Sequence, residues 1–127
     1  MNTQITPRSI AQPAANYAHA MLVENPRRVL YTSGVVPTSP DGSTPQSLHE
    51  QTEVVWANIA AILAEADMTV SDIVSITTYV VNSEPLADVM AVRDRILGDH
   101  RAASILVTVP ALARPAWRLE IAVIAAN

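Results

Sequence analysis

Hydrophobic and polar positions change their spacing several times along the chain, and each change marks an expected element. Apolar side chains recur at three- and four-residue steps over residues 44–67 and 85–98, which predicts two amphipathic helices. Runs rich in β-branched and other apolar residues predict five strands: Ala18–Glu24, Arg28–Val36, Asp72–Val81, Ser104–Val109 and Trp117–Ala125. The first twenty residues, which contain two prolines, are expected to form an irregular arm.

Turn and cap residues set the limits of these elements. The short polar break at Asn25-Pro26 predicts a hairpin between the first two strands, and the Pro- and Ser-rich residues 37–43 form a turn cluster after them. Thr44 is a good N-cap because Pro45 would stand at the first helical position, and Gly98 is typical of a helix C-terminus. The element order is therefore β-β-α-β-α-β-β.

This order predicts one α+β domain over residues 1–127, with two helices on one face of a mixed sheet. No third helix exists to cover the other face. The last strand alternates Leu119, Ile121 and Val123 with Glu120, Ala122 and Ile124. Because the second set is too apolar for open water, we expect the chain to oligomerise through that face.

Composition removes several classes of function. Half of the 127 residues are hydrophobic and 16% are charged, which excludes a disordered chain. Without Cys there is no thiol nucleophile or disulfide, and the eight basic residues are all Arg, so Schiff-base and P-loop lysine chemistry are excluded. The net charge of −4 and the lack of a basic run argue against a nucleic-acid partner.

Targeting segments and metal ligands are not expected either. No stretch approaches the roughly 18 apolar residues of a membrane span, and the N-terminus lacks the pattern of a signal peptide. We therefore expect a soluble, cytoplasmic protein. His19, His49 and His100 lie far apart in the sequence, so no metal site is predicted.

Several segments, in order, resemble the RidA/YjgF family over nearly the whole chain. They are Tyr17, the run Tyr31-Thr32-Ser33-Gly34, the run Asp72-Ile73-Val74, and most specifically residues 112–121, LARPAWRLEI. The resemblance implies a chorismate-mutase-like subunit in a homotrimer with a central β-barrel. It also implies three clefts between neighbouring subunits, each binding a small molecule.

The resemblance further implies hydrolysis of reactive enamines and imines to 2-oxo acids and ammonia, without a metal or organic cofactor. In that family an arginine binds the substrate carboxylate, Ser/Gly groups orient the substrate, and a glutamate near the C-terminus helps to place water. Glu120 matches that glutamate and is the candidate catalytic residue. Alternatively, Glu120 forms an ion pair with Arg118 or Arg114 of its own or another subunit.

The candidate substrate-binding residues each have a second interpretation. Ser33 and Gly34 approach the ligand or form a β-bulge, and Tyr17 closes the cleft or anchors the arm. Trp117 covers the cleft or packs in an interface. Arg114 is a surface cation or a displaced carboxylate-binding residue.

Ser104 is where this chain departs from the family pattern, because the alignment of residues 102–107 places it at the arginine. A hydroxyl cannot form the bidentate pair that a guanidinium forms with a carboxylate, so a non-standard substrate is expected. Ser104 could also be a solvent-facing hydroxyl, and no His-Asp pair supports it as a nucleophile. The alternative function is a non-catalytic trimer that binds or senses a small ligand. Ribonuclease activity, also ascribed to the family, is disfavoured by the acidic balance.

Overall fold

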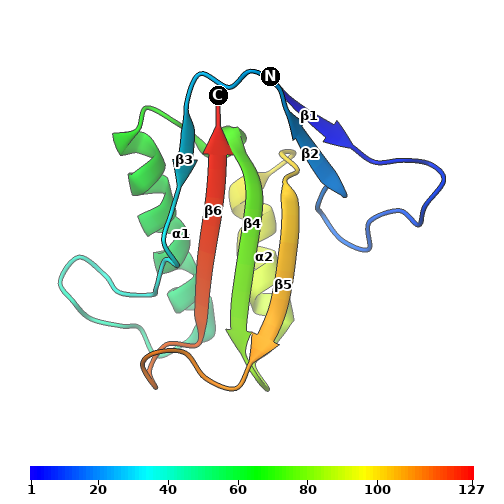
Figure 1. Ribbon diagram of the computed structural model, residues 1–127. Coiled ribbons are helices and arrows are strands. Elements are labelled where there is room, and N and C mark those ends of the chain that lie inside the picture. Colours follow the sequence, from blue (N-terminus) through cyan, green and yellow to red (C-terminus); the bar gives the residue numbers. More distant parts are fainter.

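The computed structural model describes all 127 residues and has an α+β fold, as expected. Its helices and strands, in chain order, are β1 (Asn2–Ile5), β2 (Ala20–Val23), β3 (Val29–Tyr31), α1 (Leu48–Glu65), β4 (Ile73–Val81), α2 (Leu86–Leu97), β5 (Ala103–Val109) and β6 (Leu119–Ala126), with a short 3-10 turn η1 (Val70–Asp72) before β4. Four strands form a mixed sheet in the order β3-β6-β4-β5, and β1 pairs with β2 in a separate ribbon (Figure 1).

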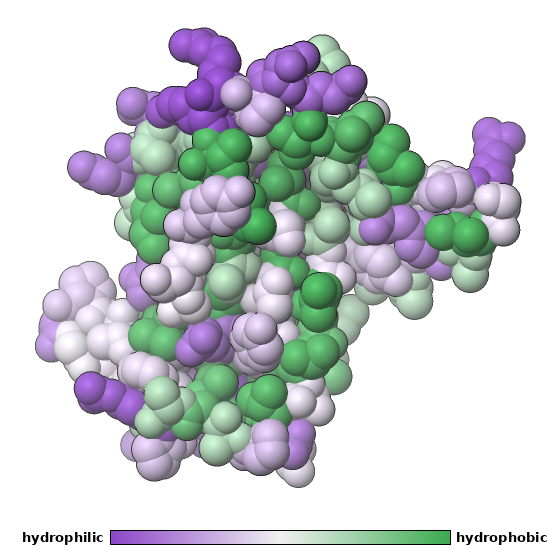
Figure 2. Space-filling model, viewed as in Figure 1, coloured by the Kyte–Doolittle hydropathy of each residue, from purple (hydrophilic) through white to green (hydrophobic).

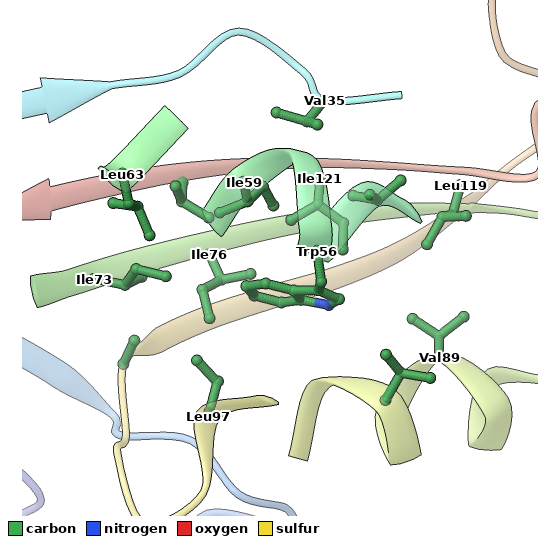
Figure 3. Close-up of a cluster of buried hydrophobic side chains, with 14 of the residues drawn as sticks. Val35, Trp56, Ile59, Leu63, Ile73, Ile76, Val89, Leu97, Leu119 and Ile121 are labelled. Atoms are coloured by element: carbon green, nitrogen blue, oxygen red, sulfur yellow. The ribbon is translucent and has the colours of Figure 1, made fainter. Parts of the chain in front are cut away.

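Both helices lie behind the four-stranded sheet, on the same face (Figure 1). The core fills the space between these two layers. Trp56 stands at its centre, between Ile76 of β4 and Ile121 of β6, with Val89 and Leu97 of α2 nearby (Figure 3). These side chains are almost completely buried, so the helix-covered face carries the hydrophobic stabilisation of the chain.

The register of the central strands decides which residues share a face. Strand β4 runs parallel to β5 and antiparallel to β6, and Ile76 stands opposite Ser104 on one side and Val123 on the other. Ser104 therefore points to the helix-covered face. Tyr79 of β4 pairs with Glu120 of β6, three positions along from Ile76, and both point to the opposite face.

That second face, here called the open face, is apolar although nothing covers it. Tyr31 is 72% exposed and Ile105 is 57% exposed, and Val29 and Val107 are exposed beside them. Figure 2, viewed from this side, shows hydrophobic residues spread over much of the sheet. The alternation of β6 predicted this uncovered apolar surface, which in a single chain faces solvent.

The predicted pairing of the first strands is wrong. Strand β2 does not form a hairpin with β3; it pairs with β1, which lies in the segment expected to be irregular. Strand β3 instead pairs with β6 at the other end of the chain, with Tyr31 opposite Ile124. Each partner is remote in sequence, so the polar break at Asn25-Pro26 indicated a turn but could not indicate which strands pair.

The helix ends agree better with the sequence. Helix α2 ends before Gly98, whose φ of +57° favours glycine and whose N–H donates to the carbonyl of Asp94 at 3.0 Å. Helix α1 begins later than predicted, because the N-cap is Ser47 and not Thr44. The Ser47 hydroxyl accepts a hydrogen bond from the N–H of Glu50 at 3.1 Å.

Candidate functional site

Ser33 and Gly34 lie in an irregular step between β3 and β6. Thr32 donates its N–H to the carbonyl of Val123, and Val35 exchanges hydrogen bonds with Ile121. Val35 is thus three residues from Thr32, whereas their partners Ile121 and Val123 on β6 are two residues apart. The segment therefore contains one extra residue, as in a β-bulge. The bulge interpretation of Ser33-Gly34 agrees with this pattern, and a bulge also turns the local backbone away from regular pairing.

Gly34 is required by the position of Glu120. A side chain at position 34 would overlap the Glu120 carboxylate, so the carboxylate lies directly over the glycine backbone. Glu120 is half-buried on the open face, and no hydrogen bond or ion pair within the chain reaches its carboxylate. A carboxylate of this kind is free to accept hydrogen bonds from water or a ligand.

The ion pair expected as an alternative for Glu120 does not form within the chain. Arg118 contacts Glu84 instead, with 3.4 Å between Nε and Oε1. The Arg114 guanidinium lies over the Trp117 ring, 5.4 Å from the centroid, as a cation–π contact in the loop before β6. Both arginines are thereby engaged elsewhere.

A cavity of about 450 Å³ opens beside Ser33 and Gly34, between this segment and α1. The Asn58 side chain of α1 donates to the carbonyl of Thr38 at 2.9 Å and fixes the outer wall. Residues that line the cavity are Tyr31, Thr32, Ser33, Gly34, Val35, Val36, Thr38, Asn58 and Ile62. The Glu120 carboxylate is outside this lining, on the open face.

Tyr17 and Ser104 come together at the opposite edge of the sheet. The arm runs beside β5, where the N–H of Ala18 donates to the carbonyl of Ala102 at 3.0 Å. Tyr17 and Ser104 line a cavity of about 280 Å³ with Ala15, Met90, Arg93 and Leu106, here called the α2 pocket. The Tyr17 hydroxyl accepts a hydrogen bond from the N–H of Ala14 at 3.3 Å.

Arg93 is the charged residue of this pocket, and it was not among the residues predicted for the site. A signal was present, because Arg93 follows Val89 by four residues and precedes Leu97 by four, so it lies on the buried stripe of α2. A charge at such a position is unusual in a helix that packs on a sheet.

Arg114 and Trp117 belong to a third region, the loop between β5 and β6. Hydrogen bonds from Gln51 of α1 hold this loop in place. The buried Gln51 amide donates to the carbonyls of Pro45 and Ala116, both at 2.8 Å, and accepts the N–H of Arg118 at 3.0 Å. Neither Arg114 nor Trp117 lines the α2 pocket. Within one chain, Arg114 is therefore not placed to replace an arginine at Ser104.

The predicted site residues form separate groups that do not all meet within a single chain. Glu120 lies on the open face against Gly34, whereas Ser104 lies on the helix-covered side of the edge strand β5. Strand β4 separates the two. A site that uses both residues would need a second copy of the chain.

Asp41 and the three histidines make local hydrogen bonds or ion pairs. Hydrogen bonds from the hydroxyl and N–H of Ser43, at 2.7 and 2.9 Å, lower the pKa of Asp41 in an exposed turn. No three side chains of His, Asp or Glu gather as a metal site would require. His19 and His100 each contact a backbone carbonyl, and His49 contacts Glu53.

Comparison with known proteins gives one consistent group of relatives. A family model described as Endoribonuclease L-PSP matches residues 8–127. The crystal structure of YyfB from Yersinia pestis, a protein of unknown function in the conserved Rid protein family, has a TM-score of 0.88 and 32% identity. It covers 99% of this chain and 98% of its own.

Mmf1, a mitochondrial protein of Saccharomyces cerevisiae, is 33% identical over 114 residues, which are 87% of this chain and 77% of Mmf1. In the present chain, no helix has the length and apolarity that crossing a membrane requires. The expected cytoplasmic location stays a prediction.

Escherichia coli TdcF, named as a candidate reactive intermediate deaminase, is 28% identical over 75 residues, 58% of each chain. A crystal structure of TdcF with bound serine matches with a TM-score of 0.74 at 22% identity, covering 98% of both chains. At that identity the structural likeness concerns the fold.

Proposed function

Because the chain belongs to the RidA/YjgF/L-PSP (Rid) family, we propose that it binds a small imine, enamine or carbonyl compound and hydrolyses a C–N bond. The observation that carries this proposal is the Glu120 carboxylate, which lies over Gly34 without a partner of its own. The bound serine in the TdcF structure supports a small-molecule ligand for this fold.

The proposed reaction needs little beyond orientation and proton transfer, because an imine carbon is already electrophilic. Water adds to that carbon, a C–O bond forms, and the C=N electron pair moves to nitrogen, which takes a proton. The hydroxyl proton of this intermediate then passes to the amino nitrogen, the C–N bond breaks, a carbonyl forms, and ammonia leaves. Glu120 accepts the proton of the attacking water and returns a proton to nitrogen. An enamine first takes a proton at carbon to give an iminium ion, and water adds to its carbon in the same way.

The proposed site lies between two copies of the chain in a homotrimer with a central barrel. Two features support this assembly: the uncovered apolar face, with Tyr31 and Ile105 exposed, and the separation of Glu120 from Tyr17 and Ser104 within one chain. One copy would supply Ser33, Gly34 and Glu120. Its neighbour would supply Tyr17 and Ser104, while Trp117 and Arg114 border the site or the interface.

The substrate is proposed to differ from those of family members with an arginine at this position of β5. Ser104 supplies a neutral hydroxyl at the α2 pocket, so it cannot neutralise a substrate carboxylate. If the substrate is an acid, another group must hold its charge.

Ammonia release on a panel of freshly generated imines and enamines tests the reaction. The Glu120→Gln variant keeps the size of the side chain but removes the proton acceptor, so turnover should fall about a hundredfold. Glu65→Gln, a change at an exposed acid in the last turn of α1, is the matched control and should leave turnover unchanged.

Equal turnover by wild type and Glu120→Gln would contradict the role of Glu120. Ligand binding without ammonia release from any compound would instead favour a binding or sensing trimer. RNA cleavage, which the description of the family model names, is not expected from a chain of net charge −4 without lysine.

A further inference from the structure

Arg93 has an unusual environment for a charged residue. It is the one ionisable residue among the buried residues of the chain, and its side chain is only 7% exposed. Burying a guanidinium is unfavourable unless hydrogen bonds and an opposite charge compensate it. The hydrogen-bond partners of the Arg93 guanidinium therefore indicate whether its charge is compensated within the chain.

The compensation within the chain is incomplete. Nε and Nη2 of Arg93 donate to the same oxygen of Asp94, at 3.1 and 3.0 Å, and Nη1 has no hydrogen bond. Trp56 Nε1 is the only fully buried side-chain nitrogen or oxygen without a partner, so Arg93 Nη1 keeps contact with solvent. The α2 pocket is the cavity that Arg93 lines, and it is where a further acceptor can reach the guanidinium.

The rest of the α2 pocket suits a small organic anion. Tyr17 and Ser104 bring hydroxyl groups that can donate hydrogen bonds, whereas Met90, Leu106 and Ala15 supply apolar walls. Such walls lower the local dielectric constant and strengthen the attraction between a guanidinium and a carboxylate. A volume of about 280 Å³ has room for a compound of a few carbon atoms.

We propose that Arg93 binds the carboxylate of the ligand in the α2 pocket and so replaces, from helix α2, the arginine that strand β5 lacks. This inference rests on the proposed function, because it names the group that holds the substrate of that site. It also explains the small residue at position 104. Two guanidinium groups, one from α2 and one from β5, would repel each other in a single cavity of this size.

Binding of 2-oxobutanoate, measured by calorimetry, tests the proposal independently of turnover. Its methyl ester is the neutral counterpart. Wild type should bind the acid at least tenfold more tightly than the ester. Arg93→Met should weaken binding of the acid about tenfold to hundredfold and leave the ester nearly unaffected. Arg95→Met is the matched control and should change neither affinity. Arg95 is on the same helix but exposed, with its Nη2 3.5 Å from Oε2 of Glu53.

A relocation variant makes the test sharper. Ser104→Arg in the Arg93→Met background should restore part of the preference for the acid, because the guanidinium returns to the pocket from β5. The same Ser104→Arg change in wild type should not increase the preference for the acid over the ester, since the Arg93 guanidinium is already in the pocket. Arg93→Lys, which keeps the charge in case Arg93→Met does not fold, should retain some preference for the acid over the ester.

The proposal is overturned if wild type shows no preference for the acid, or if Arg93→Met keeps that preference. It is also overturned if both Arg93 variants dissociate the oligomer, because Arg93 would then pair with a carboxylate of another copy. Failure of the hydrolytic function looks different. In that case no imine releases ammonia, while the Arg93-dependent preference for the acid remains.

Discussion

The two faces of the four-stranded sheet are both apolar, but they differ in what accompanies the apolar residues. On the helix-covered face, Ile76 and Ile121 pack against Trp56 in a closed core. On the open face, Glu120 lies without a partner within the chain, in register with Tyr79 and the exposed Val107. A hydrophobic surface of this kind is suited to contact with another chain, and the carboxylate within it is suited to a ligand.

Strand β6 separates these two roles residue by residue. Leu119, Ile121 and Val123 are buried, whereas the alternate residues Glu120, Ala122 and Ile124 point to the open face. Stability and function can therefore be changed independently at neighbouring positions. Changes on one side should affect the folding of the chain, and changes on the other should affect its assembly or turnover.

The largest effect is expected on the helix-covered face. Ile121→Ala removes a fully buried side chain from the core and should lower the free energy of unfolding by about 2–5 kcal/mol. Ile124→Ala, on the same strand but on the open face, should lower the free energy of unfolding by less, and this loss should depend on protein concentration. Denaturant titrations at two concentrations measure both. Equal, concentration-independent losses would break the distinction between the faces.

Assembly should respond to a charge on the open face. Ile105→Asp would place a carboxylate in the proposed interface and should weaken association of the subunits at least about a hundredfold. Light scattering should then report the 13.6 kDa chain in place of a species of three times that mass. Ala61→Asp, at an exposed position of α1 that lines no cavity, is the control and should leave the mass unchanged. A wild-type protein of single-chain mass would exclude the shared site.

The smallest effect is expected at the contact between Gly34 and Glu120. Gly34→Ala would displace the Glu120 carboxylate from its place over the backbone, so turnover should fall about tenfold with the oligomer intact. In the double variant with Glu120→Asp, which shortens the acidic side chain, the loss of turnover should be smaller than the sum of the losses, in free energy, of the two single variants. Initial rates of ammonia release measure this, and additive losses would show that the contact does not position the carboxylate.

The sequence predicts what is local in this fold and misses what is remote. Pro85 and Gly98 limit α2 correctly, because caps and glycine conformations act within one helical turn. The pairing of β3 with β6 joins Tyr31 to Ile124, and nothing near either residue specifies the other. Strand β1 was missed because its four residues are mostly polar and exposed, and only the pairing with β2 makes it a strand.

The candidate site shows the same limit. The family resemblance singled out Tyr17 and Ser104 separately, but their meeting depends on how the arm runs beside β5. Arg93 could have been found from the spacing Val89, Arg93, Leu97 alone, because a charge on a buried stripe calls for a partner. Which cavity this charge faces depends on tertiary packing, which periodicity does not specify.

Gln51 limits how two surface loops can move. One amide group joins the carbonyls of Pro45 and Ala116 and the N–H of Arg118, so two loops far apart in sequence share a single anchor on α1. Neither loop can swing outward without breaking bonds that also restrain the other. The two loops are therefore expected to behave as one stiff unit, so that any displacement of one must be accompanied by displacement of the other.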